Sequence, residues 1–135
     1  MNSKDISNAI KARLLTVAGA PSIAWPNVEF NSSVVPRWEA TLVRQRTDPS
    51  LKGGGAIERE EGSLQVVLCV EHGLGEDAVL DYLDAVRTTF PKGQTFAVAG
   101  GTITVLTEPA ETAQGFPDTK TYRSPIALQY VANAT

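Results

Sequence analysis

The sequence predicts an α+β protein in which two α-helices pack on one face of an antiparallel β-sheet, with a protruding hairpin that carries a Gly-rich loop. Two segments have apolar residues at helical spacing, and the segments between and after them alternate as strands do. Their order along the chain, α, β, β, α, β, β, β, favours helices gathered on one side of a sheet. A chain of 135 residues, of which 42% are hydrophobic and 20% charged, is typical of one globular domain, so we expect a single domain over residues 1–135.

The first helix is predicted from the apolar residues that follow Ser3, which we take as its N-cap. They recur at steps of four, four and three and are Ile6, Ile10, Leu14 and Val17. Gly19 is expected to end the helix. We expect the polar residues of its other face to be solvent-exposed; they are Lys4, Asn8, Lys11 and Arg13.

The next segment, residues 21–36, contains three prolines and a run of polar residues. Proline removes a backbone donor and restricts its neighbour to extended conformations, so we expect an extended arm with little regular structure. Trp25 stands between Ala24 and Pro26, and we expect its ring to anchor this arm on the domain.

Two strands joined by a long loop are predicted to form the hairpin. In residues 37–46, Trp38, Ala40 and Leu42 share one face of a half-buried strand. Residues 47–55 contain Asp-Pro and three consecutive glycines, which predict a mobile loop. Residues 56–72 alternate again and form the expected central strand. The charged tip is expected to reach beyond the core.

The second helix is predicted to open at residues 75–77, where acidic side chains suit a helix N-terminus. Its apolar face is Val79, Leu83, Val86 and Phe90. After it, we expect two short strands joined by a two-residue turn at Gly100 and Gly101. The last strand covers residues 120–131, where Pro125 indicates an edge strand or a break in pairing.

The overall charge argues against two classes of partner. Twelve basic and fifteen acidic residues give a net charge of −3, which does not provide the cationic field that drives nonspecific nucleic-acid or membrane binding. The single cysteine excludes an intramolecular disulfide and suits a reducing compartment. No signal-peptide pattern and no run of about 18 apolar residues is present, so we expect synthesis in the cytoplasm and no membrane association.

No catalytic or cofactor motif is present, so we expect no enzyme activity, no metal and no cofactor. Cys69 and His72 would project to opposite faces of a strand, and one Cys with one His is too few ligands for zinc. The three glycines precede a strand and lack the lysine of a phosphate loop. The acidic group around Arg59 is more typical of a solvated or partner-facing surface than of an acid/base pair.

The distribution of charge suggests how copies could associate. Residues 36–59 carry five cations and three anions, whereas residues 60–84 carry seven anions and no cation. One surface of a protomer could therefore pair with the other surface of its neighbour, and such a heterologous contact closes into a ring if the rotation permits. The alternative is that both are ordinary solvated faces. The candidate interface residues are Arg37, Arg44, Arg46, Lys52, Glu58, Arg59, Glu60, Glu61, Glu71, Glu76, Asp77, Asp81 and Asp84.

The chain resembles the tail terminator proteins of long-tailed bacteriophages, in particular the group similar to the lambda tail terminator. The resemblance extends from about Ser3 to Val131. Three pieces carry it: Trp25-Pro26-Asn27 with Phe30, residues 61–66 (EGSLQV) after the Gly-rich loop, and Ala85-Val86-Arg87 leading to Phe90-Pro91. The sequence departs from the family after that loop, where acidic residues flank Arg59 and members often carry more basic ones.

The resemblance implies a structural role without catalysis. Such proteins form a ring, typically hexameric, on the head-proximal end of the tail tube, stop its polymerisation and join it to the head connector. The implied partners are copies of the chain itself, the major tail tube protein and the head-tail connector protein. DNA would pass through the ring without sequence-specific recognition, and the protein would lie in the virion tail at the head-tail junction.

Two other functions stay open at this point. One is a head-tail connector, or neck, protein of the same virion, because small α+β ring-forming proteins occur on both sides of that joint. The other is a small ligand-binding module that would use a groove near Trp25 and Tyr122.

Overall fold

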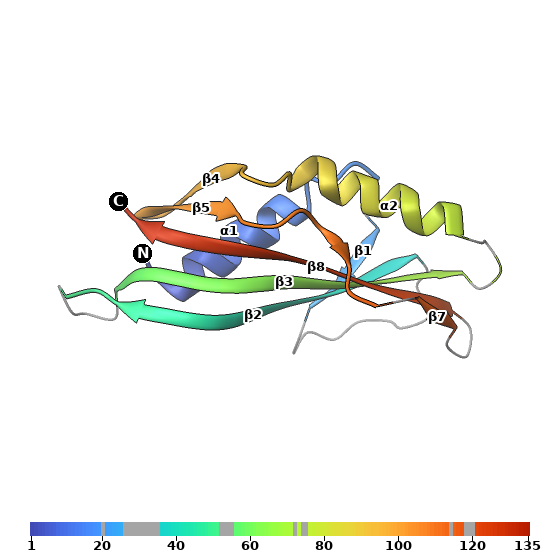
Figure 1. Ribbon diagram of the computed structural model, residues 1–135, viewed down its shortest axis with the longest axis horizontal. Helices are drawn as coiled ribbons and strands as arrows, with labels where there is room; N and C mark the ends of the chain where they lie inside the picture. The colour runs from blue at the N-terminus through green and yellow to red at the C-terminus, as the bar shows by residue number, and fades with distance from the viewer. Residues whose placement is uncertain are drawn as a thin grey trace.

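The computed structural model is built around three long strands that pair antiparallel through the middle of the molecule (Figure 1). They are β2 (Arg37–Pro49), β3 (Ile57–Glu71) and β8 (Thr121–Ala134). The structure describes residues 1–19, 21–25, 36–51, 56–71, 73, 76–113, 115–117 and 121–135.

Five shorter strands extend this sheet. β1 (Ser22–Ala24) pairs with the start of β2, β5 (Gly101–Val105) pairs with the end of β8, and β4 (Thr95–Val98) pairs with β5, which gives the order β1-β2-β3-β8-β5-β4. Two very short strands, β6 (Ala110–Glu111) and β7 (Phe116–Pro117), also pair with β8.

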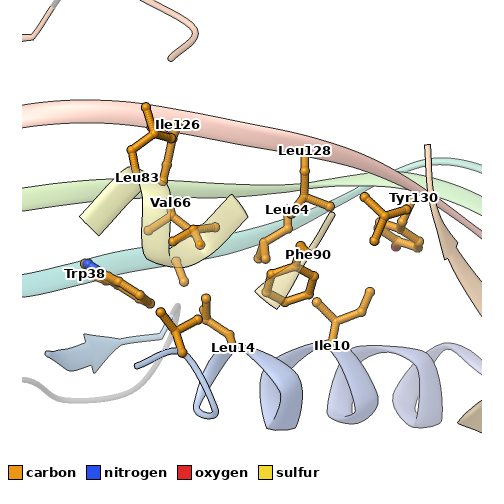
Figure 2. Close-up of a cluster of buried hydrophobic side chains, with 14 of the residues drawn as sticks. Ile10, Leu14, Trp38, Leu64, Val66, Leu83, Phe90, Ile126, Leu128 and Tyr130 are labelled. Atoms are coloured by element: carbon orange, nitrogen blue, oxygen red, sulfur yellow. The ribbon is translucent and has the colours of Figure 1, made fainter. Parts of the chain in front are cut away.

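Both helices cover the same face of the sheet, as predicted. α1 (Ser3–Leu14) contributes Ile6, Ile10 and Leu14 to the core, and α2 (Glu76–Thr89) contributes the face predicted from its periodicity. Figure 2 shows Ile10 and Leu14 of α1 pointing toward the strands, with Phe90 beside Leu64 and Leu128.

Register explains why one face of the sheet is continuously apolar. Trp38 lies opposite Leu68, and Ala40 lies opposite Val66, which in turn lies opposite Ile126. Because side chains alternate along a strand, these pairs place every second residue of the three strands on the covered face. The predicted pleat faces of both hairpin strands are therefore confirmed.

The first helix begins and ends differently from the prediction. Asn2, and not Ser3, is the N-cap, because its side chain accepts a hydrogen bond from the Asp5 N–H at 2.9 Å. The helix ends at Leu14, five residues before Gly19, although Val17 is still buried.

Two side chains of the predicted solvent face of α1 are partly covered. The Arg13 guanidinium donates a hydrogen bond to the Thr89 carbonyl at 2.9 Å and lies 4.8 Å from the centre of the Phe96 ring. The Lys11 ammonium lies 5.2 Å from the centre of the Trp25 ring. Long basic side chains can cover aromatic surface while their charged ends remain hydrated, which the periodicity alone does not reveal.

The arm contains a short strand that the sequence analysis missed, and this strand corrects the fold prediction. β1 pairs with β2 in parallel, so the sheet is mixed and not purely antiparallel. Trp25 follows β1 and packs against the core, as expected of an anchor. Phe30, one of the residues that carry the family resemblance, lies outside the described residues.

The first hairpin strand is longer than predicted. β2 continues through Thr47 and Asp48 to Pro49, so the expected loop starts later than Thr47, and a bulge interrupts the pairing between Arg44 and Arg46. A bulge lets a strand accommodate one extra residue without losing its pairing beyond it. The three glycines lie outside the described residues, so a protruding hairpin with a mobile loop stays a prediction.

One detail of the C-terminal half also differs. Val98 pairs with Gly101, so the turn between β4 and β5 is Ala99-Gly100, one residue earlier than predicted; Gly100 has a φ of +80°, which suits glycine.

Pro125 lies in a central strand, at the break in pairing that the prediction allowed. It stands opposite Val67 of β3, and β6 and β7 pair with β8 on either side of it. The Thr112 N–H donates a hydrogen bond to the Pro125 carbonyl. The nitrogen and the carbonyl of one strand residue point to the same side, so the Pro125 ring nitrogen also faces away from β3 and no hydrogen bond to β3 is lost.

Gly62 should be replaceable only at a cost in stability. A Cβ built there would lie 2.5 Å from the Val43 carbonyl oxygen and 2.7 Å from the Tyr130 hydroxyl. Gly62→Ala should lower the free energy of unfolding by about 1–3 kcal/mol, measured by urea denaturation. Ser63→Ala, one residue along and on the other face, is the control. Equal stability of Gly62→Ala and the wild type would contradict this packing.

Candidate assembly surfaces

Six of the predicted interface residues lie together at the end of the β2–β3 pair. They are Arg44, Arg46, Glu58, Arg59, Glu60 and Glu61. Arg37 lies at the other end of β2. Lys52 and the side chain of Glu76 lie outside the described residues.

The arginines at this end of the hairpin already have acidic partners in their own chain. Arg46 pairs with Asp48 at 3.1 Å, and Arg59 pairs with Glu61. Both pairs are largely solvent-exposed, so each contributes little to stability. They nevertheless reduce the surplus positive charge that the hairpin offers to a neighbour.

Glu60 is fully buried and belongs to the interior. One carboxylate oxygen accepts a hydrogen bond from the Ser3 hydroxyl at 2.9 Å and lies 3.3 Å from Nε of Arg44. The other accepts a hydrogen bond from the Tyr130 hydroxyl, also at 2.9 Å. A buried carboxylate needs such partners, because removing it from water is costly. We name Ser3, Arg44, Glu60 and Tyr130 the Glu60 cluster.

Tyr130 reaches Glu60 because Gly62 leaves room for its ring. Tyr130 lies opposite Gly62 in the pairing of β3 with β8, and Glu60 is two residues away on the same face. Burial raises the pKa of the Tyr130 phenol above its usual range, and the Glu60 carboxylate raises it further. The phenol therefore remains a hydrogen-bond donor.

A second group of charges lies on the sheet face away from the helices. Glu39 is bridged to Arg37 at 3.5 Å and also pairs with Arg123. Arg37 is one of the predicted interface residues, whereas Glu39 and Arg123 were not predicted. Only the register of β2, β3 and β8 brings position 123 beside position 39, so no local pattern could have shown it.

The remaining predicted acids form a separate, exposed surface. Glu71 ends β3, and Asp77, Asp81 and Asp84 lie on the outer face of α2. Asp84 lies 3.6 Å from Arg87, and its side chain is 72% exposed. Within the described residues Asp77 and Asp81 have no basic partner. The structure therefore separates this acidic surface from the hairpin charges.

A groove of about 330 Å³ lies on the open face of the sheet beside β6. Its polar lining consists of three amides, two carboxylates and three hydroxyls; they are Gln45, Gln65, Gln129, Glu108, Glu111, Ser63, Thr107 and Thr112. None of its lining residues is a histidine, cysteine or lysine, so it does not pair a nucleophile with such a base. Trp25 and Tyr122, the other proposed ligand site, are half-buried side chains that pack against the core.

The described part of the chain also offers no metal cluster and no membrane-spanning helix. No group of three or more His, Cys, Asp or Glu side chains there could hold a metal ion. Cys69 is buried, and His72 lies outside the described residues. None of the described helices is long and apolar enough to cross a membrane.

Comparison with known proteins gives a family and a fold. Residues 5–130 match the family model described as phage tail terminator protein. No curated protein matches the chain. A solved structure of a protein that is 20% identical matches with a TM-score of 0.77, covering 100% of this chain and 98% of the other. At this identity the likeness shows a shared fold.

The raised pKa of Tyr130 predicts how stability depends on alkaline pH. An unfolded tyrosine loses its proton near pH 10, whereas folded Tyr130 keeps it to higher pH. The contribution of Tyr130 to the free energy of unfolding is therefore complete below pH 10, and it falls by about 1.4 kcal/mol for each pH unit above pH 10. Tyr130→Phe should remove this slope and, by leaving one Glu60 oxygen without its donor, cost about 1–3 kcal/mol at neutral pH.

The measurement is urea unfolding from pH 8 to pH 11, with Tyr122→Phe as the control outside the Glu60 cluster. The prediction is wrong if Tyr130→Phe is as stable as the wild type at neutral pH and loses stability above pH 10 as steeply as the wild type. The Tyr130 hydroxyl would then neither stabilise Glu60 nor cause the alkaline loss of stability.

Proposed function

The chain belongs to the phage tail terminator protein family, and we propose that it forms a ring on the head-proximal end of the phage tail tube. In this position it ends polymerisation of the tube and provides the surface to which the head is joined. The family is one of structural tail proteins and not of enzymes, so the chain is a structural component of the phage tail.

The observation that carries the proposal is the extent of the family match. Residues 5–130 include nearly all of both helices and the whole of the sheet except the last residues of β8, so the match concerns the complete fold and not one motif. The charged groups support a role at surfaces, since the acids on α2 are exposed and have few partners in their own chain.

We propose that the ring is a homo-oligomer, a hexamer as is typical of the family, held by a heterologous contact between neighbouring copies. The exposed acids of α2 belong to this contact. Pairing of the hairpin arginines with a neighbour's carboxylates stays a prediction, and their own-chain partners weaken it. The hairpin end, where charges of both signs alternate, is proposed to contact the tail tube protein or the head-tail connector.

The rest of the assignment follows from this position. The protein is made in the host cytoplasm, has no cofactor and becomes part of the virion tail at the head-tail junction. DNA passes through the ring channel, and the net charge of −3 suits passage without strong binding to phosphates.

Addition of the purified protein to polymerising tail tube protein tests the proposal. Tubes should stop growing at a concentration near that of tube ends, and electron micrographs should show the protein at one end only. Portal-bound heads, with no tube present, are the control that separates a terminator from a neck protein. Tubes that reach the same lengths with and without the protein would contradict the proposal.

A further inference from the structure

The outer faces of the two helices carry charges of opposite sign at the same spacing. On α1 and its C-cap residue the outward-facing set is Lys4, Asn8, Lys11 and Leu15, and on α2 it is Asp77, Asp81, Asp84 and Thr88. Both follow the spacing i, i+4, i+7, i+11, which keeps each set within about 60° around its helix. We call these sets the basic stripe and the acidic stripe.

Burial supports the placement of both stripes at the surface. Three members of the basic stripe are exposed and Lys11 is half-buried against Trp25. All four members of the acidic stripe are exposed. Each stripe also has an exposed leucine in it or beside it: Leu15 is 63% exposed and Leu80 is 37% exposed.

The fold itself does not account for these charges. Lys4 lies in the first turn of α1, where the helix dipole disfavours a cation, and it has no acidic partner among the described residues. Asp81 and Asp84 lie beyond the first turn of α2, so the dipole stabilises them little. Among the described residues, the Asp84 carboxylate has only its long contact with Arg87, at 3.6 Å.

We propose that the basic stripe of one copy docks on the acidic stripe of a second copy. The two lysines are seven residues apart, as are Asp77 and Asp84, which is about 10 Å along each helix. Lys4 and Lys11 can therefore each pair with one of Asp77 and Asp84 at the same time, and Asn8 then lies opposite the middle of the acidic stripe. The leucines add apolar area to a contact that charge alone would hold weakly.

This contact rests on the proposed function, because it supplies the heterologous interface that a ring requires. Each protomer uses its α1 on one neighbour and its α2 on the other, so no stripe is left free in a closed ring. It leaves the hairpin end and the open face of the sheet available for the tube and the connector.

Charge reversal tests the contact. Lys4→Glu with Lys11→Glu gives a chain with two acidic stripes, and Asp77→Lys with Asp84→Lys gives a chain with two basic stripes. Each double variant alone should self-associate at least about tenfold more weakly than the wild type in sedimentation velocity. An equimolar mixture should recover assembly, because every contact in an alternating ring then joins opposite charges.

The control is Lys92→Glu, a change at an exposed residue outside both stripes, which should assemble as the wild type does. Circular dichroism checks that each variant is folded. The neutral variant Lys4→Gln with Lys11→Gln should weaken assembly less than the reversal does.

Several results would overturn the contact. The contact is contradicted if the double variants assemble like the wild type, or if mixing two folded variants does not restore assembly. It is also contradicted if the wild type stays monomeric at every concentration. None of these decides the proposed function, which the tube experiment tests separately. Charge-sensitive assembly that stops at two copies would uphold the contact and contradict the ring.

Discussion

The buried carboxylate of Glu60 is the interaction on which the arrangement of α1 against the sheet depends. It draws one partner from each of three elements: Ser3 from α1, Arg44 from β2 and Tyr130 from β8. Loss of one partner would leave a buried charge incompletely compensated, which for the Tyr130 hydroxyl costs about 1–3 kcal/mol. A shifted register between these strands would have the same effect, so the cluster helps to specify the pairing that makes one sheet face continuously apolar.

The same cluster separates charges that serve the fold from charges available to partners. Glu60 and Arg44 looked like members of one mixed surface, but they neutralise each other at the boundary of the core. Arg46 and Arg59 are compensated within the hairpin. Among the described residues, the outer faces of the helices keep charges that have no ion-pair partner in their own chain, namely Lys4, Asp77 and Asp81. Assembly in this account therefore depends on the helical layer, while the strands supply rigidity.

Much of the fold could be predicted because the signals are periodic and local. The second helix and the pleat faces of β2 and β3 follow from alternation or helical spacing alone. The misses concern features that no local pattern encodes. Parallel pairing of β1 depends on where the arm returns to the sheet. The burial of Glu60 depends on the space that Gly62 leaves and on the hydroxyl of Tyr130, which lies 70 residues from Glu60 in the sequence. The pairing of Glu39 with Arg123 likewise exists only across three strands.

The native mass of the wild-type protein across a series of concentrations and ionic strengths, with negative-stain images of the same samples, decides whether copies of this chain close into a ring. We expect a closed ring with a central hole that dissociates as salt rises, because its contacts are ion pairs that dissolved salt can screen. Open filaments, or particles of monomer size under all conditions, would contradict a protomer whose surfaces are built to close a ring on copies of itself.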